Sequence, residues 1–152
     1  MSLMHTAEQE YCSIQKQAHP YCVACSLLNE KGLHLNFEAD DDGVVAHFEC
    51  DRDCEGYPGI LHGGIIATIL DGAMGNCLFV RGQAAVTVEM TTRFRHPIYI
   101  NRQATVNARL VRNADPLYLL EAEIVQDGQV KATAEGKFYD QPQLAQFDSE
   151  NE

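Results

Sequence analysis

The longest apolar stretch of the chain follows His62 and has the spacing of an α-helix. Between residues 63 and 80 the only charged side chain is Asp71. A helix on a protein surface would carry a polar stripe. Here two adjoining stripes are apolar, one made of Ile65, Ile69 and Ala73 and the other of Ile66, Leu70 and Met74. The third face consists mostly of small residues: Ala67, Thr68, Gly72, Gly75 and Asn76. The pattern predicts a central helix enclosed by the rest of the chain, with one carboxylate facing a gap between small side chains.

Two glycines inside this predicted helix need a structural reason. Each costs roughly 1 kcal/mol relative to alanine in a helix interior. We therefore expect another backbone segment to pass close to Gly72 and Gly75.

Alternation of hydrophobic and polar residues predicts six β-strands. They cover residues 32–38, 44–50, 85–95, 104–111, 118–125 and 130–139. In the strand that follows the helix, Val86, Val88 and Met90 are expected on one face, and Thr87, Glu89 and Thr91 on the other.

Short links between these strands favour antiparallel pairing, because parallel strands need long crossovers. Turn signals lie at residues 40–43, 113–116 and 127–128. Residues 6–18 predict a short N-terminal helix capped by Thr6, with Gln9 at the capping-box position. The predicted fold class is α+β, with an antiparallel sheet of about six strands curled around one long helix.

Length and composition indicate one compact domain, residues 1–152, with 45% hydrophobic residues. A formal net charge of −11 argues against nucleic-acid binding. The acidic C-terminal segment from about residue 142 is expected to be disordered. We predict neither a signal peptide nor a membrane span, since no basic segment precedes a long apolar run. Six cysteines without a secretory signal favour a reducing, cytoplasmic location.

Asp71, the only charged residue of this predicted helix, needs an explanation. An aspartate at a helix edge is ordinarily salt-bridged or solvated. Here the helix starts at His62-Gly63-Gly64, where free N–H groups and the positive end of the helix dipole gather. Such donors suit a developing oxyanion, so a base and an oxyanion hole on one helix indicate hydrolase-like chemistry.

The segment Pro58-Gly59-Ile60-Leu61-His62-Gly63-Gly64, followed by Leu70-Asp71, resembles the signature of the hotdog-fold acyl-CoA thioesterases of the phenylacetate-degradation type. The resemblance runs from about Cys22 to Phe138. It implies the hotdog fold and hydrolysis of a thioester to a carboxylic acid and free coenzyme A. It implies no cofactor, because coenzyme A is part of the substrate.

The resemblance also implies roles for individual residues. Asp71 would act as general base or nucleophile, and the backbone N–H of Gly63 would bind the carbonyl oxygen. Thr87 would help to hold the attacking water. His62 would orient the start of the helix rather than act as the base, and Gly64 would lie against the substrate.

The loop before the His-Gly-Gly departs from the family pattern. Several relatives carry an asparagine there that helps to place water or the carbonyl. The loop Cys54–Pro58 has none. Glu55 or a backbone group would have to replace it.

Basic residues near the later strands are candidates for the nucleotide end of coenzyme A. In an acidic protein, the cluster Arg93-Phe94-Arg95-His96 could hold phosphates, and we assign Arg93 and Arg95 to substrate binding. The alternative is that these arginines serve solubility and edge protection.

Cysteines offer a possible metal site that we do not expect to be used. Cys22 and Cys25, with His19 nearby, and Cys50 and Cys54 could supply four zinc ligands from two knuckles. The spacing is irregular, and cysteine is also a small buried hydrophobe. We therefore predict no metal, and no cysteine nucleophile.

The spacing of the two catalytic groups leads to an expectation about assembly. Gly63 and Asp71 are eight residues apart, roughly 12 Å along one helix. They cannot both reach one thioester, so Gly63 is expected to serve the carbonyl attacked by the Asp71 of a neighbouring subunit. We expect a homodimer, or a dimer of dimers. The alternatives are a hydratase or dehydratase of the same fold and a non-catalytic acyl-CoA-binding protein.

Overall fold

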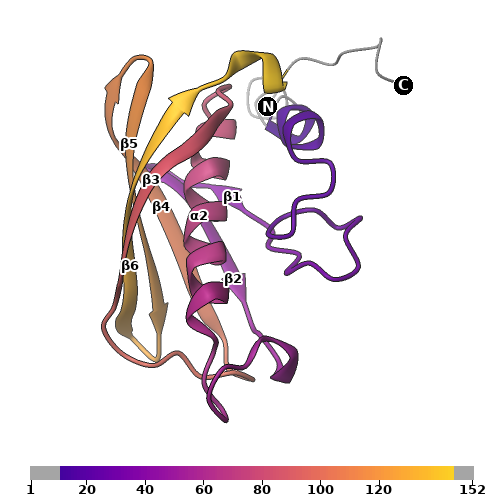
Figure 1. Cartoon of the computed structure of the whole chain (residues 1–152), viewed down its shortest axis with the longest axis vertical. Helices are drawn as coiled ribbons and strands as arrows, with labels where there is room; N and C mark the ends of the chain where they lie inside the picture. Colours follow the sequence, from indigo (N-terminus) through magenta and orange to yellow (C-terminus); the bar gives the residue numbers. More distant parts are fainter. Residues whose placement is uncertain (1–10, 146–152) are drawn as a thin grey trace.

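The computed structural model describes residues 11–145 as a six-stranded antiparallel sheet packed around one long helix, α2 (Gly63–Phe79). The strands are β1 (Glu38–Ala39), β2 (Gly43–Phe48), β3 (Ala85–Phe94), β4 (Ala104–Ala114), β5 (Leu117–Gln126) and β6 (Gln129–Asp140). Their order in the sheet is β1-β2-β4-β5-β6-β3. Helix α2 lies between the sheet and the N-terminal segment (Figure 1). This is the predicted α+β class and architecture.

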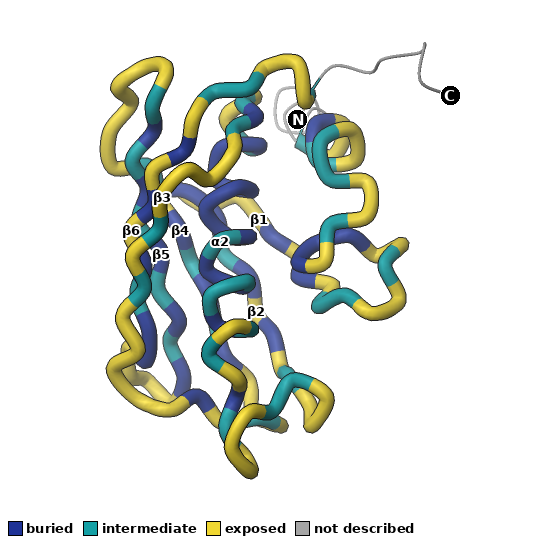
Figure 2. The backbone as a smooth tube through the Cα atoms, in the orientation of Figure 1, coloured by how far each residue is buried: buried dark blue, intermediate teal, exposed yellow. Residues whose placement is uncertain are grey.

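Helix α2 begins after His62, whose side chain caps it. The Nδ1 atom of His62 accepts a hydrogen bond of 2.8 Å from the N–H of Gly64, which satisfies one free amide of the first turn. Every residue from Gly72 to Phe79 is buried, and this part of α2 has the dark blue of buried residues in Figure 2. Burial of this second half of the helix explains why it carries no polar stripe, whereas several residues of the first half are only half-buried.

The two glycines of α2 differ in their surroundings. A Cβ atom on Gly72 would lie 2.8 Å from the Cβ atom of Ala24, so the N-terminal segment does pass close there. The close neighbour is a side chain rather than the backbone that we expected. A Cβ atom on Gly75 would meet nothing within 4 Å. For Gly75 the expectation is wrong, because its surface faces open space.

Five of the six predicted strands are confirmed with small shifts at their ends. Residues of β5 alternate between buried and half-buried along the whole strand, as expected for a sheet with one face on the core. The predicted turn at residues 113–116 is shorter than expected. Asn113 and Ala114 still pair with β5.

The predicted strand at residues 32–38 is wrong for most of its length. Only Glu38 joins Ala39 in β1. The N–H groups of Leu33 and Leu35 instead donate to the carbonyl oxygens of residues 23 and 24, at 2.8 and 2.9 Å. Leu35 and Phe37 are buried. The alternation therefore reflects burial of every second side chain against the core, without a strand neighbour.

Strand β3 contains a β-bulge that changes which side chains face the helix. The register with β6 shifts between Thr87 and Glu89. Thr87 pairs with Phe138, which is buried, so Thr87 lies on the helix side of the sheet together with Met90. The prediction that Thr87 and Glu89 share a face is wrong, because the extra residue Val88 shifts the alternation by one.

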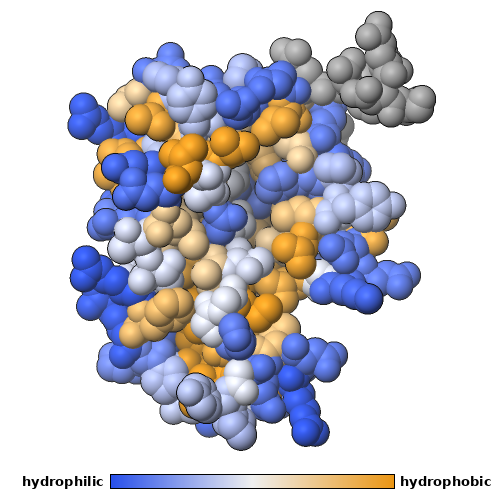
Figure 3. All heavy atoms as spheres, viewed as in Figure 1, coloured by the Kyte–Doolittle hydropathy of each residue, from blue (hydrophilic) through white to orange (hydrophobic). Residues whose placement is uncertain are grey.

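Strand β3 is also an edge of the sheet and carries exposed apolar side chains. Val86, Val88 and Phe94 are 39%, 54% and 56% exposed. Hydrophobic side chains gather on the molecular surface where β3 runs (Figure 3). A long edge strand with unpaired backbone groups and apolar side chains is a template for pairing with another chain.

The chain ends are described in part. Residues 11–18 are helical, and the rest of the helix predicted at residues 6–18 lies outside the described residues. Where the C-terminal segment was expected to become disordered, the structure has a short 3-10 helix, Pro142–Ala145. The segment after residue 145 lies outside the described residues. No helix within residues 11–145 is long and apolar enough to cross a membrane.

Candidate active site

The carboxylate of Asp71 is held by the hydroxyl of Thr87. Thr87 Oγ1 donates to Asp71 Oδ1 at 2.6 Å, a short distance typical of a hydrogen bond to a charged acceptor. Asp71 projects from the middle of α2, and Thr87 reaches it from β3 because of the bulge at Val88. The structure thus brings together two of the predicted site residues, 16 positions apart in the sequence.

A cavity of about 320 Å³ opens beside this pair. Gly75, one turn after Asp71, forms part of its wall, and the absent side chain at this position leaves the space free. The wall also includes residues from both ends of the described chain. Its lining residues are Ala18, His19, Asp71, Gly75, Phe79, Ala84, Ala85, Val86, Thr87, Phe138 and Leu144.

The start of α2 presents free backbone donors, and Gly63 carries the first of them. The N–H of Gly64 is taken by His62, whereas the N–H of Gly63 has no acceptor among the described residues. A Cβ atom on Gly64 would lie 3.1 Å from His62 Nδ1. The geometry therefore gives His62 and Gly64 a shared capping contact and leaves the N–H groups of Gly63 and Ile65 without an acceptor among the described residues, with Gly63 the first of the helix.

Gly63 and Asp71 do not meet within one chain. Gly63 lines two other cavities at the helix start, of about 270 and 400 Å³, and neither includes Asp71. Roughly 12 Å of helix separates the two residues. A single chain therefore does not combine this donor and this carboxylate.

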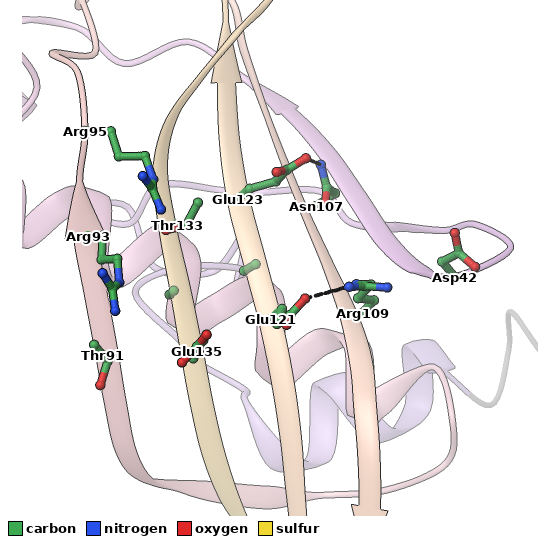
Figure 4. A pocket seen from close by; sticks show the side chains of 12 residues that line it. Asp42, Thr91, Arg93, Arg95, Asn107, Arg109, Glu121, Glu123, Thr133 and Glu135 are labelled. Carbon is green, nitrogen blue, oxygen red and sulfur yellow. Dashed lines mark hydrogen bonds and ion pairs between the residues drawn. The ribbon is translucent and has the colours of Figure 1, made fainter.

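Arg93 and Arg95 lie on the other side of the sheet from Asp71. They line a polar cavity of about 620 Å³ on the face that α2 does not cover (Figure 4). On that face Arg109 forms a 2.7 Å ion pair with Glu121. Neither Arg93 nor Arg95 forms an ion pair with a described residue. Arg95 also lines the smaller cavity beside Gly63, so it is the closer of the two arginines to the start of α2.

Glu55 is occupied within its own loop. Its Oε2 atom accepts a 3.0 Å hydrogen bond from the N–H of Gly59. Gly59 has a φ of +80°, a conformation that favours glycine. Glu55 therefore stabilises the turn before His62, and its carboxylate does not reach the Asp71 cavity.

The cysteine pairs are separated in the structure. Cys22 and Cys25 gather with His19, whereas Cys50 and Cys54 belong to neither this cluster nor the Asp71 cavity. A hydrogen bond from Cys25, aided by His19, holds the pKa of Cys22 well below the usual range of a thiol. The four-ligand zinc site considered from the sequence is therefore not assembled by the described residues.

Sequence reasoning missed several walls of the Asp71 cavity. His19 and Leu144 come from segments far from α2 in the sequence, and only the folded chain brings them there. The sequence marks Gly75 as an unusual residue for a helix interior but does not reveal that it forms part of a pocket wall. An unexplained glycine one turn from the candidate base was the available signal.

Comparison with known proteins identifies the family. A model of the thioesterase superfamily matches residues 58–133, half of the chain. Acyl-coenzyme A thioesterase THEM4 of Bos taurus is 32% identical over 71 residues. These cover 47% of this chain but only 29% of that protein, so the similarity spans less than a third of this curated relative.

Solved structures agree in fold. Protein RHA08564, a thioesterase superfamily protein, matches with a TM-score of 0.73 and 25% identity, over 76% of this chain and 61% of that chain. The Escherichia coli PaaI protein from the phenylacetic acid degradation operon matches with a TM-score of 0.71 and 22% identity, over 91% and 99%.

A hypothetical thioesterase from Streptococcus pneumoniae, solved with coenzyme A, matches with a TM-score of 0.66 and 18% identity, over 70% of this chain and 87% of that one. Two further structures are single variants of that protein, one with an aspartate and one with a threonine replaced by alanine, and the two positions are 16 residues apart. With the family match over half of its residues and the shared architecture, the chain belongs to the thioesterase superfamily and has the hotdog fold.

Proposed function

We propose that the protein hydrolyses an acyl-CoA thioester to a carboxylic acid and free coenzyme A, with Asp71 as the general base or nucleophile. The observation that carries the proposal is the Thr87–Asp71 hydrogen bond at the edge of a cavity. The spacing of this pair equals that of the aspartate and threonine replaced in the Streptococcus pneumoniae protein. The coenzyme A bound to that relative supports an acyl-CoA substrate.

The hydrogen bond to Thr87 suits either role of Asp71. It fixes the orientation of the carboxylate through Oδ1. Oδ2 accepts no hydrogen bond from a described residue, so it is free to take a proton from water or to attack the thioester carbon. Thr87 uses its proton on Asp71 and keeps its oxygen lone pairs to accept a hydrogen bond from that water.

Attack on the thioester carbon places negative charge on the carbonyl oxygen. The free N–H of Gly63, at the positive end of α2, is suited to stabilise this charge. Collapse of the tetrahedral intermediate breaks the carbon–sulfur bond and releases coenzyme A as the thiolate. If Asp71 is the base, the thiolate takes up the proton that Asp71 removed from water. If Asp71 is the nucleophile, water then hydrolyses the anhydride between Asp71 and the acyl group. Because Gly63 is too far from Asp71 in one chain, the donor would come from a second subunit. We therefore propose a homodimer with two shared sites.

The edge position of β3 supports this assembly. Its unpaired backbone and exposed Val86, Val88 and Phe94 would be covered by a second copy. Antiparallel pairing of β3 with its own copy would obey two-fold symmetry. The same strand carries Thr87, so the interface would form close to the site.

Arg93 and Arg95 remain candidates for the phosphates of coenzyme A. Both are exposed cations without an ion pair among residues 11–145. Arg95 lines the cavity beside Gly63, where a thioester bound at the helix start would direct its nucleotide. The proposed hydrolysis requires no cofactor, and the proposed location is cytoplasmic.

The first test replaces Asp71 by asparagine. We expect kcat to fall by at least ~10²-fold with KM changed only a few-fold, because the base acts in the transition state. Glu89→Gln is the matched control, since Glu89 lies on the outer face of β3 and pairs with Lys137. Release of thiol from acyl-CoA also distinguishes hydrolysis from hydration and from binding alone. An Asp71→Asn protein with nearly full turnover would remove Asp71 from the mechanism.

The shared site is tested by complementation between two inactive variants. Gly63→Pro removes the N–H but fits the first helical position, since His62 before it is already extended (φ −61°, ψ 136°). Gly63→Ala keeps the N–H, and its Cβ would make an ordinary 3.5 Å contact with Phe94, so it serves as the control.

Mixing Gly63→Pro with Asp71→Asn under conditions of subunit exchange should restore about a quarter of wild-type activity. Half of the dimers are then mixed, and each mixed dimer has one intact site. Persistent inactivity despite demonstrated exchange, or a fully active monomer in sedimentation, would contradict the shared site.

A further inference from the structure

A compact set of metal-ligating side chains lies outside the proposed catalytic pair. One ligating atom each from His19, Cys22 and Cys25 lies within 4.8 Å of the other two. Cys25 Sγ is 3.7 Å from His19 Nδ1. Cys25 is 5% exposed and the other two residues are half-buried, so the cluster is partly withdrawn from solvent.

Local hydrogen bonds shape the segment that carries the two cysteines. The N–H of Ala24 points at Cys22 Sγ, 3.3 Å away. The N–H of Ser26 donates to the carbonyl of Cys22, closing a tight turn around the Cys-x-x-Cys segment. Ser26 Oγ donates to the carbonyl of Pro20 at 2.8 Å and ties the other side of the turn to the residue after His19. These contacts hold the turn from Cys22 to Cys25 and fasten it to Pro20, the residue after His19, without a metal.

The donor set selects the kind of ion. Two sulfurs and one imidazole nitrogen are soft or borderline ligands that favour Zn²⁺ over Mg²⁺ or Ca²⁺, which prefer oxygen. No further His, Cys, Asp or Glu of the described residues joins the cluster, so a tetrahedral ion would keep one position for water or a solute. We propose that His19, Cys22 and Cys25 form a three-ligand site for a thiophilic metal ion of the zinc class.

The proposal reverses the expectation drawn from the sequence for a definite reason. From the sequence we predict no metal, because the site considered there combines two cysteine pairs of irregular spacing into four ligands. The structure separates Cys50 and Cys54 from the cluster and supplies His19 as the third ligand instead.

The site would clamp the N-terminal segment onto α2. The ring of His19 contacts the ring of Phe79 edge-on, with centroids 4.8 Å apart. Ala24, between the two cysteines, lies against Gly72. His19 also lines the Asp71 cavity, so the metal would support one wall of that cavity. This structural role is independent of whether the protein hydrolyses acyl-CoA.

The experiment measures metal content and thermal stability of the full chain. Protein purified under reducing conditions with Zn²⁺ and freed of excess ion should hold about one equivalent by mass spectrometry. Cys22→Ser and Cys25→Ser should reduce this to a small fraction, and His19→Asn should weaken retention during dialysis. Cys50→Ser is the matched control and should keep the metal. Circular dichroism checks that each variant folds.

A second measurement uses the wild-type chain alone and does not depend on the variants. Dialysis against a chelator should lower Tm by at least ~5 °C, as expected for loss of a ligand present at ~100 times its Kd. Zn²⁺ should restore Tm, and Mg²⁺ should not. A wild-type protein without stoichiometric zinc overturns the proposal. So does zinc retained in the Cys22→Ser/Cys25→Ser double variant, or a Cys22–Cys25 disulfide in freshly isolated protein.

Discussion

Replacing Thr87 tests how the β-bulge places a hydroxyl on the carboxylate that we propose to be catalytic. In Thr87→Val the branched shape of the side chain is kept and only the hydrogen bond to Asp71 is lost. A hydrogen bond to a charged group contributes about 1.5–3 kcal/mol. Thr87 is exposed in the single chain, so we take about 1.5–2 kcal/mol, which corresponds to a 10- to 30-fold lower kcat. Thr87→Ser keeps the hydroxyl and should stay within a few-fold of wild type.

The exchange of two neighbouring residues tests the bulge itself. In a regular strand, Val88 would face α2 in place of Thr87, and the double variant Thr87→Val/Val88→Thr would restore a hydroxyl near Asp71. With the bulge observed between Thr87 and Glu89, threonine at position 88 does not take that place. We therefore expect the double variant to be as impaired as Thr87→Val.

The assay follows thiol released from acyl-CoA with a chromogenic thiol reagent. The protein is kept at low concentration, so that its six cysteines add little signal. Tm is recorded for each variant, because loss of an exposed hydroxyl should leave stability nearly unchanged. Full activity of Thr87→Val would refute the role of the hydrogen bond. Recovery of activity in the double variant would refute the bulge as the element that orients Thr87.

Two further predictions concern stability. Gly75→Ala should raise the free energy of unfolding by about 0.5–1 kcal/mol, because its Cβ meets open space. Gly72→Ala should lower the free energy of unfolding, because its Cβ would lie 2.8 Å from Ala24. Denaturant titration measures both variants, and equal effects would contradict the assigned packing. Burial raises the pKa of Cys77 from 9.0 to about 11, so as the pH rises the thiol of the unfolded chain deprotonates before that of the folded chain. The free energy of unfolding should therefore fall between about pH 9 and 11, by up to ~3 kcal/mol. The decline should be smaller in Cys77→Ala and unchanged in Cys12→Ala, where the thiol is exposed; the same decline in all three proteins would exclude Cys77 as its source.

The central helix and most strands could be predicted because their patterns reflect burial directly. Helix α2 was recognisable from an apolar run with one charge, and its start from His62-Gly63-Gly64. The segment Leu33–Phe37 shows the limit of the same reasoning. Alternate burial of Leu35 and Phe37 against the core produces the pattern of a strand, although the backbone bonds to residues 23 and 24 rather than to a sheet.

The sequence names Asp71 and Thr87 as site residues, and the structure places them in contact, but the sequence does not reveal the geometry of that contact. Asp71 and Thr87 were identified from the sequence by resemblance, yet regular alternation placed Thr87 beside Glu89. A bulge depends on the register between β3 and β6, and neither strand reveals it by itself. The cluster of His19 with Cys22 and Cys25 shows the same limit. The sequence places these three residues close together, but it does not show that Cys50 and Cys54 lie elsewhere.

The two edges of the sheet have very different lengths, which limits how far assembly can proceed. Strand β3 is 10 residues long, whereas β1 at the opposite edge has 2. An acidic turn, Asp40–Asp42, follows β1 directly. In the proposed dimer, pairing of β3 with its own copy would use the long edge of both chains and would leave only the two short edges free. Growth by strand addition would then stop at two chains, so an association that could otherwise propagate into a fibre is self-limiting.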